Sequence, residues 1–75
     1  MHPATIEAGK SYSNGQFGNR WEVRSVIRCT EETVHYKVSV GEQRRRNFTC
    51  PLAEFARWAT HEVIRNENSW ERALA

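Results

Sequence analysis

The fold of this chain is decided by residues 21–40, WEVRSVIRCTEETVHYKVSV. Two runs in which apolar and polar residues alternate, 21–29 and 34–40, are separated by the polar segment 30–33. Alternation with a period of two is typical of half-buried β-strands, and a four-residue polar connection is typical of an antiparallel hairpin. We therefore expect these residues to form the central hairpin of a sheet.

The alternation also predicts which side chains of this hairpin face the core. The inward set is Trp21, Val23, Ser25, Ile27 and Cys29 in the first strand, and Val34, Tyr36, Val38 and Val40 in the second. The outward set is Glu22, Arg24, Val26 and Arg28, followed by His35, Lys37 and Ser39. Side chains that pair across antiparallel strands share one sheet face, so a row of cations is predicted on the outward face.

The flanking segments extend this sheet and then change period. Residues 10–13 are expected to form a short first strand, 13–19 a turn, 41–46 a polar loop and 47–50 another strand. A helix is expected over 51–66, because a proline suits the first helical position and apolar residues follow at helical spacing. That helical stripe consists of Leu52, Phe55, Ala56, Ala59 and Val63.

The predicted architecture is mainly β within the α+β class: an antiparallel barrel or meander that is curled and closed by one C-terminal helix. It forms one domain over residues 10–66, with a loose N-terminus at 1–9 and a tail or short helical turn at 67–75. The expected core is Trp21, Val23, Ile27, Val34, Tyr36, Val38, Val40, Phe48, Leu52, Phe55, Ala59 and Val63.

Length and charge limit the possible functions. The 75 residues suffice for one small domain, which excludes a nucleotide-binding α/β fold or a barrel enzyme. The net charge is only +2, yet residues 10–50 hold eight basic and four acidic side chains. A domain of this size rarely encloses a substrate pocket, so no enzyme activity, no cofactor and no small-molecule substrate are expected.

The histidines and cysteines indicate neither a metal site nor a disulfide framework. No pair among them has the spacing of metal ligands, and Cys29 and Cys50 are too few and too far apart for a disulfide scaffold. There is no apolar run long enough for a signal peptide or a membrane span. We therefore expect a cytoplasmic protein with reduced thiols, no metal and no membrane partner.

Three stretches carry a family resemblance, namely 12–24, 34–38 and 50–59. They contain a strand that begins with arginine or tryptophan, a Val-x-Tyr strand and a Phe-x-x-Trp-Ala helix. In these features the chain resembles small uncharacterised bacterial and phage proteins. The resemblance implies an SH3-like barrel with a C-terminal helix, and an origin in a phage or mobile element. It implies no catalytic residue.

The first functional hypothesis is nucleic-acid binding, to DNA or RNA, through a basic sheet face. The candidate contacts are Arg24, Arg28, His35, Lys37, Arg44, Arg45 and Arg46. Cations with a nearby aromatic ring, here Tyr12 or Phe17, are typical of small nucleic-acid-binding modules. The competing interpretation is a solvated face that keeps the sheet edge soluble.

The second hypothesis is a protein-interaction or homodimerisation module. Its candidate contacts are Trp58 and Trp70, because an exposed tryptophan near a helix end often marks a protein contact. For Trp58 the favoured interpretation is a core position at the mouth of the barrel. Trp70 has no obvious core to join, so it is expected to dock back on the barrel or on a second copy.

Overall fold

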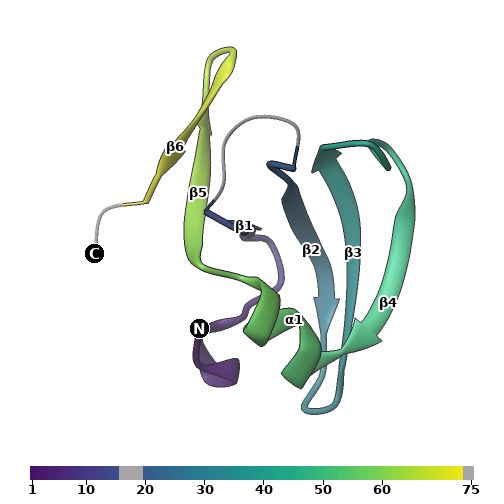
Figure 1. The fold of residues 1–75 in the computed structure, drawn as a ribbon. Helices are drawn as coiled ribbons and strands as arrows, with labels where there is room; N and C mark the ends of the chain where they lie inside the picture. The colour runs from purple at the N-terminus through teal and green to yellow at the C-terminus, as the bar shows by residue number, and fades with distance from the viewer. Residues whose placement is uncertain (16–19, 74–75) are drawn as a thin grey trace.

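The computed structural model describes residues 1–15 and 20–73. Within them, six strands form one antiparallel sheet in the order β4-β3-β2-β1-β5-β6, with one helix (Figure 1). The elements are the 3-10 turn η1 (Pro3–Thr5), β1 (Ser11–Ser13), β2 (Val23–Cys29), β3 (Thr33–Val40), β4 (Asn47–Pro51), α1 (Leu52–Trp58), β5 (His61–Asn66) and β6 (Ser69–Arg72). The prediction of an antiparallel, mainly β fold with one helix is confirmed. The helix is not C-terminal, however, because β5 and β6 follow it.

The sheet is open. Strands β4 and β6 are its edges, and the described residues form no ladder between them. The SH3-like barrel that the family resemblance implies is therefore not confirmed. An open sheet leaves two strand edges available, which a closed barrel would have removed.

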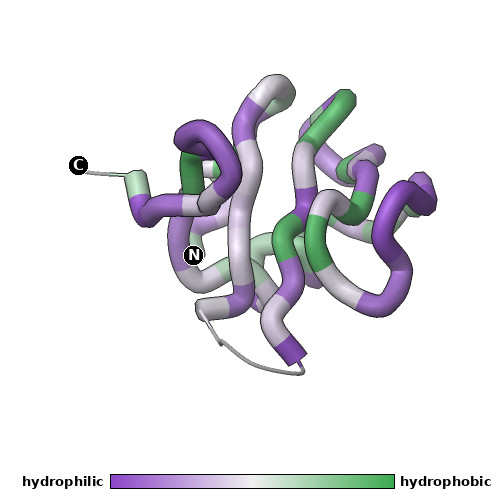
Figure 2. The backbone as a smooth tube through the Cα atoms, turned by 90° about the horizontal axis from the view of Figure 1, so that it is seen from above, coloured by the Kyte–Doolittle hydropathy of each residue, from purple (hydrophilic) through white to green (hydrophobic). Residues whose placement is uncertain are grey.

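The main core lies on the sheet face that α1 and η1 cover. Its buried residues are Ile6, Tyr12, Val26, Val34, Tyr36, Val38, Phe55, Ala56 and Ala59. Phe55 of α1 is at the centre, with its ring 5.8 Å from that of Tyr12 and 5.4 Å from that of Tyr36. We call the opposite side of the sheet the far face. Figure 2 shows that hydrophobic and hydrophilic residues both occur along the backbone of the sheet.

The predicted orientation of β2 is wrong at its centre. Val26 pairs with Tyr36 and packs into the core, whereas Ile27 is 58% exposed. The register shifts between Val23 and Arg24 and again between Val26 and Arg28, so two irregularities interrupt the alternation. A bulge adds one unpaired residue and resets which side chains face the core. The expectation from strict alternation therefore fails for Arg24, Ser25, Val26 and Ile27.

The predicted core is confirmed for Val23, Val34, Tyr36, Val38, Phe55, Ala59 and Val63. Ile27 and Phe48 are exposed instead, and Trp21, Val40 and Leu52 are half-buried. Sequence reasoning missed Ile6, Tyr12 and Val26, whereas Ala56, buried here, was placed in the apolar helical stripe but not counted in the core. Ile6 lies in the segment predicted to be a loose N-terminus, and Tyr12 lies in the short predicted first strand. Both segments are too short or irregular for periodicity to show which residues are buried.

The helix is much shorter than predicted. It ends at Trp58, because Ala59 has an extended backbone with φ −73° and ψ 128°. The segment His61–Asn66, expected to complete the helix, is strand β5 and pairs with Ser11–Ser13. It contains adjacent β-branched residues, Val63 and Ile64, which favour a strand. As a strand, this segment forms backbone hydrogen bonds with β1, which it could not form as a continuation of the helix.

Both chain ends are more structured than expected. The N-terminal ammonium donates to the carbonyl oxygens of Ala56 and Ala59, at 2.9 and 3.2 Å, and Ile6 is buried in the core. Residues 1–9 are therefore not a loose terminus. The C-terminal segment forms strand β6, paired with β5, and not a tail or helical turn. The domain thus extends well beyond 10–66 at both ends.

Candidate nucleic-acid interface

Three of the predicted contact residues do share the far face. Arg28 pairs with His35 across β2 and β3, and Lys37 lies two residues along β3 on the same side. His35 is held by a 3.0 Å hydrogen bond between its Nδ1 and the Thr49 hydroxyl of β4. Arg28 and Lys37 are exposed and His35 is half-buried. Arg28 reaches this face only because the irregularity at Ile27 turns it there.

Arg24 lies on the opposite face and is not part of this surface. Its register partner is Val38, and its guanidinium carbon is 3.9 Å from the Trp58 ring centre and 4.7 Å from that of Tyr36. The Nε–H group also donates to the Glu22 carboxylate. Arg24 therefore packs against the edge of the core, and its predicted phosphate contact has the wrong geometry.

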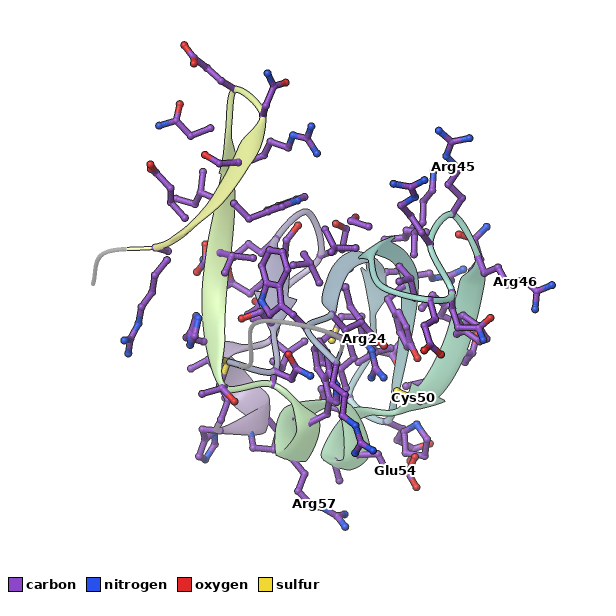
Figure 3. All side chains as sticks on the ribbon, turned by 45° about the horizontal axis from the view of Figure 1, so that its top comes forward. Arg24, Arg45, Arg46, Cys50, Glu54 and Arg57 are labelled. Atoms are coloured by element: carbon purple, nitrogen blue, oxygen red, sulfur yellow. The ribbon has the colours of Figure 1, made fainter. Side chains whose placement is uncertain are left out.

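The β3–β4 loop, residues 41–46, presents its arginines from a hydrogen-bonded turn. The amide of Arg44 donates to Gly41 O, and that of Arg45 to Val38 O. Arg45 adopts a left-handed backbone with φ 74°, which turns the chain sharply at this point. In Figure 3, Arg45 and Arg46 point away from each other at the rim of the loop.

One hollow lies between the 41–46 loop and the β5–β6 hairpin. Lys37 and two arginines of the loop line it on one side, and two residues of the hairpin line it on the other. We call it the basic hollow: its volume is about 380 Å³ and it is lined by Lys37, Val38, Ser39, Arg44, Arg45, Arg65 and Trp70. Arg46 is absent from this lining. Arg65 was missed because its segment was assigned to a helix. The adjacent β-branched residues Val63 and Ile64 were the local signal that could have placed Arg65 on a strand.

The cations of the basic hollow are not neutralised. Among the described residues, ion pairs join Lys10 to Glu7 and Glu62, and Arg24 to Glu22. None involves Lys37, Arg44, Arg45 or Arg65, and no carboxylate side chain lines the hollow. Arg65 is anchored through a 3.1 Å bond from its Nε to the backbone oxygen of Glu67. Four positive charges thus face one space, which favours an anionic ligand.

Trp70 supplies the aromatic ring of this hollow. It docks back on the far face, where it is half-buried, and the Arg65 guanidinium lies 5.6 Å from its ring centre. Its indole Nε1 is buried and has no hydrogen-bond partner among the described residues. Tyr12, one ring expected to stack on a nucleic acid, is 1% exposed and belongs to the core. The other, Phe17, lies outside the described residues.

A second hollow, of about 410 Å³, lies along the β4 side of the sheet. It is lined by Ile27, Arg28, His35, Tyr36, Asn47, Phe48 and Thr49. Its apolar rim comes from Ile27 and Phe48, which are 58% and 36% exposed. Trp58, the other candidate protein contact, is instead half-buried against Phe55, at 5.5 Å between ring centres, and against Arg24.

The other reactive side chains do not assemble into a site. In residues 1–15 and 20–73, no three His, Cys, Asp or Glu side chains gather where they could hold a metal ion. Cys29 and Cys50 are free thiols, and burial raises the pKa of Cys50. The described chain also has no helix with the length and apolarity that a membrane crossing requires.

No protein family model matches this chain, and no curated protein or solved structure is significantly similar to it. The resemblance to small phage and bacterial proteins therefore stays an expectation from the sequence. The far face and its basic hollow are the basis for a functional proposal.

Proposed function

We propose that this chain is a small non-enzymatic module that binds nucleic acid, with the basic hollow holding the phosphate backbone. The observation that carries the proposal is the meeting of Lys37, Arg44, Arg45 and Arg65 around one hollow without a carboxylate in its lining. Three of these four are arginines, whose planar guanidinium groups match phosphate oxygens in a bidentate manner. Arg28 and His35 would extend the contact along the far face.

The location of the charge supports this proposal more than its total does. The chain carries only +2 overall, which is a weak field for a dedicated nucleic-acid binder. However, two acidic side chains, Glu7 and Glu62, are paired with Lys10, and Glu22 is paired with Arg24. Within residues 1–15 and 20–73, no ion pair involves the cations of the basic hollow, which supports a local positive surface there.

The experiment is a charge-matched comparison of two double variants. Arg44→Gln/Arg45→Gln removes two cations of the basic hollow, whereas Arg20→Gln/Arg57→Gln removes two exposed cations outside it. Fluorescence anisotropy with labelled oligonucleotides over a salt series gives the affinity and its salt dependence. Glutamine is polar and uncharged, and the net charges of the two variants are equal.

We expect the wild type and the control variant to bind alike, and Arg44→Gln/Arg45→Gln to bind more weakly. The slope of log affinity against log salt should fall by about 1.4 on a single strand, because each phosphate contact contributes about 0.7. Equal losses in the two variants, or no binding of DNA or RNA by the wild type at low salt, would refute the proposal.

For the architecture, we propose an opened SH3-like arrangement. Its support is the strand order β4-β3-β2-β1-β5 with α1 inserted between β4 and β5, to which β6 is added at one end. In this arrangement, the far face and the loop 41–46 lie outside the core that α1 covers. They are therefore available to a ligand without any change in the fold.

A second candidate function is self-association through the edge strand β4. Its residues Asn47–Pro51 contain no charged side chain, and the adjacent hollow has the exposed apolar rim of Ile27 and Phe48. Edge strands usually carry charges that prevent pairing, so an uncharged edge favours a second copy. Sedimentation equilibrium should detect a dimer that Thr49→Lys abolishes, and a wild type that stays monomeric at high concentration would contradict this candidate.

A further inference from the structure

Trp70 separates two hollows of the far face. One is the basic hollow, and the other, of about 200 Å³, is lined by Gly9, Lys10, Ser11, Glu62, Val63, Ile64, Arg65 and Trp70. Arg65 lines both, as Trp70 does, and its guanidinium lies over the indole ring. An aromatic ring thus stands between two spaces of unlike charge. The basic hollow has Lys37 and no carboxylate in its lining, whereas in the smaller hollow Lys10 is paired with Glu7 and Glu62.

A row of serine hydroxyls joins the two hollows across the sheet. Ser11 lines the smaller hollow and Ser39 the basic hollow, and Ser25 lies between them. The Oγ atoms are 2.8 Å apart from Ser11 to Ser25 and 2.7 Å apart from Ser25 to Ser39. Three hydroxyls carry three hydrogens and these two bonds use two, so one O–H donor remains for another acceptor. The row therefore forms a polar path of half-buried groups beneath Trp70.

We infer that the ligand is single-stranded, and that it crosses Trp70 with one base stacked near the indole and an adjacent phosphate in the basic hollow. This inference rests on the proposed function. Bases in a duplex stack on one another and offer only their edges, whereas an unpaired base offers its face to an aromatic side chain. A tryptophan flanked by cations is the combination that binds unpaired strands in a sequence-tolerant way.

The position of the ring allows a small adjustment to a base. Its Nε1–H is buried without an acceptor among the described residues, so packing and Arg65 hold the ring and a hydrogen bond does not. Strand β6, which carries Trp70, is an edge strand that pairs with β5 alone. A shift of this one strand can present the indole without disturbing the main core, and a ligand oxygen can then supply the missing acceptor.

The test separates stacking from charge. Trp70→Leu and Trp70→Phe are compared with Trp21→Leu, a tryptophan change at a different hollow. The probes are oligo-dT and oligo-U of about 12 nucleotides and a DNA duplex of the same length. We expect Trp70→Leu to weaken binding of the single strands by about 10- to 100-fold and to leave duplex binding within about twofold of the wild type. Trp70→Phe should keep most of the affinity, and Trp21→Leu should keep all of it.

A second measurement uses the unaltered chain, in case Trp70→Leu disturbs folding. Photo-crosslinking with a single strand that contains 5-bromouracil, followed by trypsin and mass spectrometry, should place the adduct on residues 66–72. Trypsin releases this peptide by cleaving after Arg65 and after Arg72, and Trp70 is its one aromatic residue. An adduct confined to other peptides, or equal loss of duplex and single-strand affinity in Trp70→Leu, would overturn the inference.

The outcomes also separate this inference from the proposed function. If the basic hollow binds duplex and single strand equally, Arg44→Gln/Arg45→Gln still weakens both and only the single-strand inference fails. If Arg44→Gln/Arg45→Gln and its charge-matched control bind nucleic acid with the same affinity, the proposed function fails whatever the effect of the Trp70 variants. Binding of oligo-dT, of oligo-U or of both supports a single-strand site.

Discussion

The guanidinium carbon of Arg24 lies 3.9 Å from the centre of the Trp58 ring, on the helix side of the sheet. Glu22 balances its charge, and the Tyr36 ring lies on the same group at 4.7 Å. A cation enclosed by rings and a carboxylate is largely withdrawn from solvent, and only 18% of its side chain is exposed. Arg24 therefore stabilises the edge of the core, although its sequence context suggests a ligand contact.

Replacing Arg24 with methionine should reduce stability and leave binding intact. The change keeps the apolar stem, removes the interaction with Trp58 and leaves Glu22 half-buried without its partner. We expect the free energy of unfolding to fall by about 1–2 kcal/mol, the scale of a desolvated cation–π contact. Urea denaturation followed by circular dichroism measures this. A loss of nucleic-acid affinity greater than that of Arg20→Gln would show that Arg24 contacts the ligand after all.

Two adjacent residues of β2 should respond very differently to truncation. Val26 is 4% exposed and contacts the core, whereas Ile27 is 58% exposed at the irregularity. Val26→Ala should lower the free energy of unfolding by about 2 kcal/mol, because it leaves a cavity. Ile27→Ala should change it by less than about 0.5 kcal/mol. The reverse order in chemical denaturation would mean that β2 follows strict alternation without the bulge.

The hydroxyl of Tyr12 fastens the N-terminal segment to the sheet. It donates to Thr5 O and accepts from the amide of Glu7, each at 2.9 Å. Tyr12→Phe keeps the ring that packs on Phe55 and removes both bonds, so we expect a loss of about 1–2 kcal/mol. Hydrogen exchange should show faster exchange at Glu7, with little change in β3. Unchanged protection at Glu7 would argue against this anchor.

The imidazole of His61 makes stability depend on pH. Burial, with a smaller effect from the Arg72 guanidinium, holds the pKa of His61 below its ordinary value of 6.5. The unfolded chain then takes up the proton more readily, so the stabilisation is present above pH 6.5 and is lost as the pH falls through the folded pKa. His61→Gln removes this dependence and keeps a polar partner for the Ser13 hydroxyl, 3.1 Å from Nε2.

The measurement is the free energy of unfolding from about pH 7.5 to about pH 5.5, for the wild type and for His61→Gln. The carboxylates titrate in both proteins, so the difference between the two curves isolates His61. We expect the wild type to lose more stability than the variant as the pH falls. Parallel curves would show that the histidine titrates alike in the folded and unfolded chains.

Local patterns predicted the strands that pair with their neighbours in the chain. The hairpin of β2 and β3, the return strand β4 and the start of α1 follow from alternation, polar turns and a proline. Segment 61–66 was mistaken for helix because Val63 continues the apolar spacing of α1. Its strand state depends on pairing with β1, about fifty residues earlier, and a long-range ladder leaves no local periodicity to read.

The sequence by itself determined a mainly β, antiparallel domain and an excess of arginine and lysine between residues 10 and 50. Side-chain period and charge are local properties of the chain, so they can be read without a structure. Only the tertiary structure decided which cations act together. The bulge in β2 and the pairing of β5 with β1 placed Arg24 against the core and brought Arg65 and Trp70 to Lys37 and the 41–46 loop. Register and strand order fix these positions, because they set which face each side chain occupies.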